Sequence, residues 1–233
     1  MATNYNPRTV TDGLVLCLDA GNTKSYPGTG TTWTDISRNG NDGSLVNMDG
    51  ANLDSANGGS LTFDGSNEYV DADTLTAFGD NDPITVEAWI NADSLTNLYQ
   101  VIATVKANTN HWQLSYSGDP TYNLFFTFTG NQIIGTSTLP PTGKWHHIVV
   151  TYNGGSKTDI SSYKIYSSAL QQNISLKGIS GAANNKTIIG FRDGGQGSNY
   201  FDGKIAQVKI YNKVLTQEEV QQNFNVTRDR FGV

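Results

Sequence analysis

Aromatic side chains that stand beside amides are the first residues in this chain to suggest chemistry. A sugar stacks its apolar face on an exposed aromatic ring, while planar amides, His or Arg hold its hydroxyl groups. On strands with alternating apolar and polar residues, Trp89 and Phe125 lie on the solvent-facing parity. Polar residues that could lie near them, and that complete a candidate carbohydrate site, are Gln100, His111, Gln113 and Arg192. The alternative is that Trp89 fills a two-sided core and that Phe125 is covered by a loop or another chain.

Asp and Asn residues near the N-terminus suggest calcium binding. The run from Asp35 to Gly40 reads Asp-Ile-Ser-Arg-Asn-Gly, like the first half of a calcium loop of the EF-hand type. The twelfth position of such a loop needs a bidentate Glu but holds Val46, so an EF-hand is excluded. If calcium is present, Asp19, Asn22 and Asp35 are its expected ligands; the same residue types also form Asx turns without any ion. One Cys and three His residues offer no spacing for zinc.

Composition limits the protein class. The chain has 233 residues, of which only 15% are charged, and Gly, Asn and Thr make up about a third. These three residue types favour turns and strands over helices, so a helical bundle or coiled coil is excluded. The net charge is −6 and there is no Lys/Arg block, so nucleic acid is not an expected partner. Cys17 is the single cysteine and cannot form an internal disulfide.

Strand signals recur along the whole chain at a spacing of about ten residues, which is typical of an antiparallel sandwich. Turn clusters such as 64–67 and 153–155 separate them, and we expect one domain. Alternation puts Trp112 and Leu114 on a core face and Gln113 on a face open to solvent. The segment 144–152 is apolar on both faces towards its end and should be a central strand. The expected strands are 13–19, 60–64, 67–71, 83–91, 99–106, 111–117, 122–129, 132–138, 144–152, 162–167, 186–191 and 203–211.

One helix is predicted, near the C-terminus. Thr216 and Glu219 form a capping box, and Val220 and Phe224, four residues apart, should pack on the sandwich. We expect the helix to end at about Asn223. The flanks 1–11 and 226–233 are polar, as either partner-binding arms or frayed ends would be.

Four segments carry a family resemblance. They are Gly-Ser-Leu-Thr-Phe-Asp-Gly-Ser-Asn-Glu-Tyr-Val (59–70), Ile-Thr-Val-Glu-Ala-Trp-Ile (84–90), Lys-Trp-His-His-Ile-Val-Val-Thr-Tyr-Asn-Gly (144–154), and the stretch 201–220 that begins Phe-Asp-Gly-Lys-Ile-Ala-Gln-Val. In this order the chain resembles the laminin-G-like, concanavalin A-like lectin/glucanase superfamily. The segments 18–43 and 223–233 look like the version found in structural proteins of tailed bacteriophages.

The resemblance implies an all-β jelly-roll sandwich of two antiparallel sheets with one short C-terminal helix. The expected divisions are an N-terminal arm (1–11), the sandwich domain (12–225) and a C-terminal tail (226–233). The family's last strand usually reads Ile-Asp-Glu-Val and shares a calcium ion with the first strand. Here Ile205 to Val208 lacks both acids, so calcium, the one cofactor that the residues suggest, loses two ligands.

The resemblance also bears on catalysis. Hydrolases of this fold carry Glu-x-Asp-x-x-Glu, which sets two carboxylates about 5–5.5 Å apart. The four Glu residues, 68, 87, 218 and 219, do not fit that spacing. Lyases of the fold pair Tyr and His with Arg and Gln, but His146 and His147 belong to the family's ordinary structural motif. We therefore expect no enzyme activity.

The resulting hypothesis is a non-catalytic, lectin-like virion module, such as a head-decoration, fibre or tail component, that attaches to glycans or surfaces. The main alternative is a purely structural capsid or fibre protein; a polysaccharide hydrolase or lyase is the third and disfavoured hypothesis. Expected partners are other virion proteins, further copies of the chain and a cell-surface glycan. No membrane insertion is expected, and the N-terminus lacks an apolar signal region, as in a virion protein made in the host cytoplasm.

Overall fold

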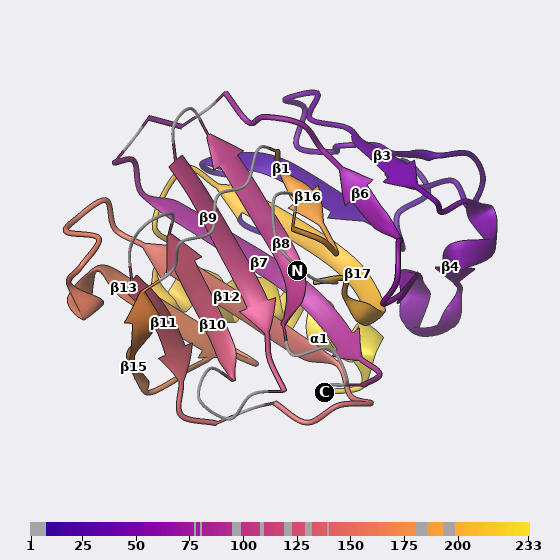
Figure 1. Cartoon of the computed structure of the whole chain (residues 1–233). Helices are drawn as coiled ribbons and strands as arrows, with labels where there is room; N and C mark the ends of the chain where they lie inside the picture. The colour runs from indigo at the N-terminus through magenta and orange to yellow at the C-terminus, as the bar shows by residue number, and fades with distance from the viewer. Residues whose placement is uncertain are drawn as a thin grey trace, which may run out of the picture.

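Two antiparallel sheets face each other, and one helix covers the outer face of the eight-stranded sheet in this computed structural model (Figure 1). The structure describes residues 8–76, 78–79, 81–94, 99–107, 110–118, 123–128, 132–138, 140–179, 186–192 and 199–233. In the described part of the chain, no helix is long and apolar enough to cross a membrane. The fold class predicted from the sequence is confirmed.

The eight-stranded sheet has β17 (Asp202–Tyr211) near its middle, where it pairs with β7 on one side and with β1 and β5 on the other. The predicted central strand at 144–152 is β12, which lies between β7 and β13. The strands of the eight-stranded sheet, in order across it, are β14 (Leu170–Gln171), β13 (Tyr163–Ser167), β12 (His146–Tyr152), β7 (Ile84–Ala92), β17, β5 (Ser60–Asp64) and β4 (Leu53–Asp54), with β1 (Leu14–Asp19) beside β17.

The nine-stranded sheet supplies the opposite layer. Its strands, in order, are β15 (Ile174–Ile179), β11 (Gln132–Thr136), β10 (Leu124–Phe128), β9 (Asn110–Tyr116), β8 (Gln100–Ala107), β16 (Ile188–Ile189), β6 (Tyr69–Asp71), β3 (Gly43–Val46) and β2 (Thr32–Trp33). Short 3₁₀ turns lie at η1 (Gly50–Asn52), η2 (Ala56–Gly58) and η3 (Ile160–Ser162). The sequence pattern predicted twelve of these strands, but not β2, β3, β4, β14 and β15, of which all but β15 have four residues or fewer.

The main core lies between the sheets, on the faces that alternation predicted. Val86 and Ala88 of β7 and Trp112 and Leu114 of β9 belong to it. The opposite face of the nine-stranded sheet was expected in solvent, and this was wrong. Gln113 is 3% exposed and Ser115 is fully buried. Alternation along a strand assigns a face, but it cannot tell whether another part of the chain covers that face.

Helix α1 (Gln217–Phe231) is longer than predicted. The predicted capping box is present, but the helix continues past Asn223 and ends at Gly232, whose φ of 69° is left-handed. Arg228 and Arg230 lie in its last turn, where cations favour the helix dipole. The boundary expected between residues 225 and 226 therefore falls inside a helix, and residues 226–231 are neither tail nor frayed end.

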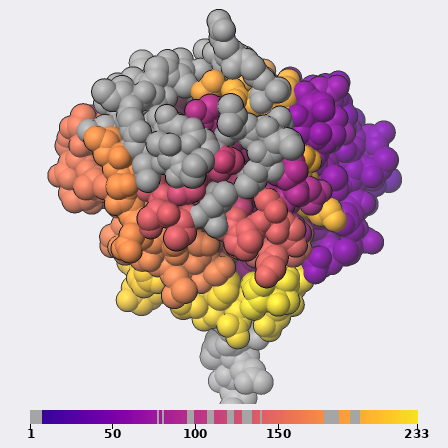
Figure 2. Space-filling model, turned by 60° about the horizontal axis from the view of Figure 1, so that its bottom comes forward, coloured from indigo at the N-terminus to yellow at the C-terminus, as the bar shows by residue number. Residues whose placement is uncertain are grey.

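Helix α1 closes a second apolar cluster on the outer face of the eight-stranded sheet. In the space-filling view the helix (yellow) lies at the lower surface of the molecule (Figure 2). Part of the expected N-terminal arm packs there as well, since Val10 N donates to Asn223 Oδ1 over 2.8 Å. Residues 1–7 lie outside the described part. The cluster contains Val10, Trp89, Trp145, Val149, Tyr166, Ala169, Ala206, Tyr211, Leu215, Val220, Phe224 and Phe231.

Candidate functional site

The outer face of the nine-stranded sheet brings together three of the predicted carbohydrate-site residues. Thr127 of β10 pairs with Gln113 of β9, and Phe125 pairs with Ser115 two residues away, so Phe125 and Gln113 share this face. Lys106 of β8 pairs with His111 of β9 and places His111 on the same face. The predicted grouping of Phe125, His111 and Gln113 is therefore present.

These three side chains are less accessible than predicted. Phe125 is 4% exposed and meets the partly exposed Tyr99 edge-on, with ring centres 6.1 Å apart. Gln113 donates to Ser115 Oγ over 2.8 Å. Burial, and then the charge of Lys106, lowers the pKa of His111, so its ring stays neutral near pH 7. These side chains can pack beneath a ligand site, but Phe125 does not expose its ring for stacking on a sugar.

Gln100 has a structural role instead of the predicted one. Its Nε2 donates to Ser94 O over 2.6 Å, and its Oε1 accepts from Asp202 N over 3.0 Å. The side chain is fully buried. It ties the start of β8 to the start of β17 and has no polar atom left over for a ligand.

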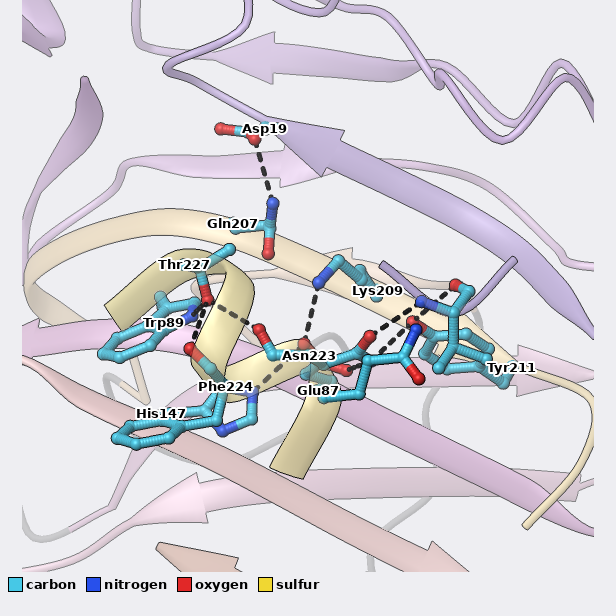
Figure 3. Close-up of polar contacts among 12 residues, drawn as sticks. Asp19, Glu87, Trp89, His147, Gln207, Lys209, Tyr211, Asn223, Phe224 and Thr227 are labelled. Carbon is cyan, nitrogen blue, oxygen red and sulfur yellow. Dashed lines mark hydrogen bonds and ion pairs between the residues drawn. The ribbon is translucent and has the colours of Figure 1, made fainter. Parts of the chain in front are cut away.

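Trp89 lies away from this face altogether. Its parity was predicted correctly, but helix α1 covers that side of β7, and the exposed fraction of Trp89 is 0%. The indole stacks on Phe231 at 4.1 Å and on Phe224 at 5.8 Å. Its Nε1 donates to Thr227 Oγ1 over 2.8 Å (Figure 3). Trp89 therefore offers no face to a sugar, which corrects the prediction that it is an exposed stacking residue.

The sequence pattern missed a partly exposed aromatic group, which we call the aromatic platform: Tyr69, Phe191 and Tyr200. The Phe191 and Tyr200 rings are stacked at 4.2 Å with an interplanar angle of 11°, and Tyr69 meets Phe191 at 5.3 Å. All three rings are partly exposed. Tyr69 alternates with the core residue Val70 on β6, so it lies on the outer face of the nine-stranded sheet.

Backbone contacts hold the platform in place beside polar groups. Phe201 N donates to Gly190 O over 2.8 Å and so sets Tyr200 beside Phe191. Arg192 follows Phe191 and is partly exposed, and its buried Nε has no hydrogen-bond partner among the residues that the structure describes. Asn199 Nδ2 is a second buried donor of this kind. Burial lowers the pKa of Arg192 from its ordinary value.

This part of the sheet has residue types that a sugar site uses: stacked rings with exposed surface, and an amide and a guanidinium side chain that are their neighbours in the sequence. Of the predicted residues, Arg192 belongs directly to it. The signal in the sequence was that Phe191 and Tyr200 flank a Gly-rich segment. No periodic pattern marks such residues, because they follow or precede strands and do not lie within them.

The predicted calcium ligands are used by the chain itself. Asp35 Oδ1 accepts from Cys17 N at 2.9 Å and from Ser37 N at 2.8 Å, and its other oxygen accepts from Ser37 Oγ and Asn41 N. Asn22 Oδ1 accepts from Lys24 N over 3.0 Å in an Asx turn. No three Asp, Glu, His or Cys side chains gather as metal ligands in the described ranges. Asp35 and Asn22 therefore do not fit a calcium site.

Asp19, the third predicted ligand, is paired with a cation of the protein. Its Oδ1 accepts from Arg230 Nη1 over 2.7 Å, and its Oδ2 accepts from Gln207 Nε2 over 2.9 Å. Gln207 stands where the family pattern has an acid. As folded, the carboxylate has no oxygen free for a metal ion.

A buried charged network lies under α1 (Figure 3). Glu87 Oε1 contacts Lys209 Nζ at 2.8 Å and His147 Nε2 at 3.0 Å, and Glu87 Oε2 accepts from Asn223 Nδ2 over 2.6 Å. Asn223 Nδ2 also lies 2.9 Å from the Tyr211 hydroxyl. Burial by itself raises the pKa of Glu87, but the charge of Lys209 and the contact with His147 outweigh it and hold the pKa at about 2.

The Glu87 network is suited to holding α1 and not to acid–base catalysis. Glu87 is 1% exposed, stays ionised and has no second carboxylate among its partners. A general acid at neutral pH needs a raised pKa and access to substrate. The network therefore leaves the aromatic platform as the candidate functional site.

A family model described as the concanavalin A-like lectin/glucanases superfamily matches residues 64–221. The chain belongs to this superfamily. The sandwich of two antiparallel sheets described above is consistent with that membership. No curated protein sequence matches the chain.

Solved structures of similar fold include two from carbohydrate-active proteins. Trypanosoma rangeli sialidase in complex with sialic acid has a TM-score of 0.60 at 18% identity over 93% of this chain and 33% of that one. Domain 4 of AbnA, a GH43 extracellular arabinanase from Geobacillus stearothermophilus, in complex with arabinotriose, has a TM-score of 0.59 at 17% identity over 92% of this chain and 98% of that one. This chain thus spans a third of the sialidase but nearly all of the arabinanase domain. At these identities the likeness concerns the fold.

Proposed function

We propose that this member of the superfamily is a non-catalytic carbohydrate-binding module whose site is the aromatic platform with Arg192 and Asn199. The observation that carries the proposal is the stack of partly exposed rings, Phe191 on Tyr200 at 4.2 Å and 11°. The neighbouring residues Arg192 and Asn199 each hold a buried donor that has no hydrogen-bond partner in the described part of the chain. Buried polar groups are normally hydrogen-bonded, and a ligand hydroxyl would supply what these donors lack. The arabinanase domain of similar fold and length, solved with arabinotriose, supports the same class of ligand.

The non-catalytic part of the proposal rests on the carboxylates. In most glycosidases, retaining and inverting hydrolysis both use two carboxyl groups that flank the scissile bond. Glu87 is buried in its ion pair, Glu68 accepts from Asn52 and Asp64 N, and Glu219 caps α1. Glu218 lies exposed on the first turn of the same helix, on the opposite sheet from the platform.

A glycan array followed by calorimetry tests the site. Wild-type protein should bind at least one neutral glycan saturably, and Tyr200→Ala and Phe191→Ala should weaken binding about tenfold or more, the change that about 1.4 kcal/mol produces. Arg192→Ala should weaken it as well. The control is Leu170→Ala, a 69% exposed side chain on β14 of the other sheet. Wild-type affinity in both platform variants, or no glycan bound by the wild type, would contradict the proposal.

We further propose that the module is displayed on a virion, because residues 18–43 and 223–233 are similar to segments of tailed-phage structural proteins. Mass spectrometry of purified virus particles from the natural source checks this. The protein should be found in stoichiometric amount and should be reached by antibody on intact particles. Its absence from such particles would overturn the virion role and leave the glycan-binding proposal standing.

A structural role in assembly is the second candidate, favoured by two exposed leucines at sheet edges. Leu176 of β15 is 50% exposed and Leu170 of β14 is 69% exposed, and each strand is the last of its sheet in the described order. An exposed apolar edge strand is a template for pairing with another chain. Size-exclusion chromatography with light scattering should then show an oligomer that Leu176→Lys converts to monomer. A monomeric wild type at high concentration would exclude self-assembly through this edge.

A further inference from the structure

Arg230, near the end of α1, donates hydrogen bonds to three oxygen atoms from two separate parts of the chain. Its Nη1 donates to Asp19 Oδ1 over 2.7 Å, and its Nε donates to Asn57 O over 2.8 Å. Its Nη2 donates to Gly59 O. The guanidinium group is thus bonded by one carboxylate at the end of β1 and by two backbone carbonyls at η2.

The backbone at η2 is shaped around this guanidinium group. Asn57, Gly58 and Gly59 all have positive φ, at 50°, 73° and 111°, a conformation that turns consecutive peptide groups. A Cβ on Gly58 would lie 3.0 Å from Arg230 Nε, and a Cβ on Gly21 would lie 2.5 Å from Nη2. Glycine at these two positions lets the backbone approach the cation closely, so the site is specifically built and is not a chance surface contact.

The acceptors around Arg230 are the kind that a hard divalent cation uses. Calcium takes six to eight oxygen ligands from carboxylates, backbone carbonyls and amide side chains. The Asp19 carboxylate and the carbonyls of Asn57 and Gly59 supply such oxygen atoms. Gln207, which donates to Asp19, has a buried Oε1 that accepts no hydrogen bond from any residue that the structure describes. Arg230 therefore stands where the first and last strands would otherwise need an external positive charge.

We propose that Arg230 is the resident cation of this site: it replaces a calcium ion, makes the fold independent of calcium and ties α1 to β1. Arginine suits this role because its planar group presents several fixed donors and stays charged at all relevant pH values. The side chain is 19% exposed and Asp19 15%, so the pair is only partly shielded from water. Without the Arg230 side chain, the same oxygen atoms form a site for a divalent cation.

Thermal melting in the presence of EGTA or of millimolar calcium tests the proposal. The melting temperature of the wild type should be the same in both, and in EGTA Arg230→Ala should melt roughly 2–4 °C lower than the wild type. Calcium should raise the melting temperature of Arg230→Ala, but not that of the double variant Asp19→Asn/Arg230→Ala. Arg228→Ala is the matched control, because Arg228 lies on the same helix with its side chain 48% exposed.

Each contrary result overturns the proposal. A wild type that melts lower in EGTA needs calcium despite Arg230. If Arg230→Ala melts like the Arg228→Ala control, the hydrogen bonds of Arg230 contribute nothing to stability. If calcium does not raise the melting temperature of Arg230→Ala, Arg230 forms only an ordinary salt bridge. If Arg230→Ala does not fold, Arg230→Lys is the second variant, because it keeps the positive charge and loses the several fixed donors of the guanidinium group. It should melt lower than the wild type, and calcium should not change its melting temperature. A melting temperature that rises with calcium would refute the assignment.

Discussion

Glu87 shows how much of this fold depends on one buried charge. Its pKa is held at about 2, against an ordinary value of 4.5, so the folded state binds its proton less tightly than the unfolded state does. By linkage, the ionised carboxylate stabilises the fold fully above pH 4.5, and this stabilisation is lost as the pH falls towards 2. The helix above it, through Asn223, is the element that this charge holds.

Glu87→Gln should lower the free energy of unfolding at pH 7 by about 3–5 kcal/mol, because Lys209 remains buried without its counter-charge. The variant should also lose much of the pH dependence between 4.5 and 2. Urea denaturation at several pH values measures both effects. The exposed Glu218→Gln serves as the control and should change stability by only a few tenths of a kcal/mol. Equal stability of Glu87→Gln and wild type at pH 7 would refute the buried-charge account.

Single residues were the hardest features to place from the sequence. The parity of Trp89 and Phe125 was predicted correctly, yet both are buried, because parity contains no information about what lies above a sheet. The lack of paired glutamates could be seen at once, since it needs only a count and a spacing. The position of Lys209 on the same face as Glu87 could have been predicted, because Lys209 alternates with Val208 and Ile210 and pairs with Glu87. The stacking of Tyr200 on Phe191 could not have been predicted in this way, because Phe191 comes from a different segment.

At the scale of elements, the sequence predicted where α1 begins but not where it ends. Thr216 and Glu219 identified the cap, but the polar composition of residues 225–230 disguised the rest of the helix. The apolar series continues from Val220 and Phe224 to Phe231, with Thr227 facing the sheet between them. A helix of this mixed composition is stable only where a sheet face offers apolar partners, and no local pattern reveals that face.

Phe231→Ala should lower the free energy of unfolding by about 3 kcal/mol, the low end for removing a buried phenyl ring. Phe231 is 5% exposed and its ring lies 4.1 Å from that of Trp89 and 4.7 Å from that of Trp145. Guanidinium denaturation followed by tryptophan fluorescence measures the loss and should also show altered native fluorescence. Val233→Ala, with a 46% exposed side chain two residues on, should behave as wild type. A loss below about 1 kcal/mol would mean that the last turn of α1 is not held by this contact.

The whole molecule was the easiest scale to predict. Short strands separated by turns predict an antiparallel sandwich. The alternation of apolar and polar residues does not predict the order of the strands within each sheet. β17, the longest strand, pairs with β7, β1 and β5, so strands far apart in the sequence meet around it. Such long-range pairing depends on the whole chain, which is why neither the sheet order nor the covered face of the nine-stranded sheet could be derived locally.

Charge across the whole molecule sets the class of glycan that the aromatic platform should accept. The net charge is −6, and burial, then Tyr69 and the carboxylate of Asp64, raise the pKa of Tyr200, so its ring stays neutral beside an acidic group. Asp71 lies on the same strand as Tyr69 and is paired with Lys186. An acidic surface repels polyanions over about 10 Å at ordinary salt concentrations, so uncharged sugars should be preferred.

Binding of a neutral glycan should therefore change by less than about twofold between low and high salt, because no ion pair with the ligand is screened. Calorimetry at several salt concentrations, with a sulfated polysaccharide as the comparison ligand, measures this. Tyr200→Phe should preserve the stacking surface and bind within a fewfold of wild type, whereas Tyr200→Ala should not. Tight binding of the sulfated polymer that weakens steeply with salt would instead assign recognition to Arg192 and the scattered basic residues, and would contradict a site built on stacking.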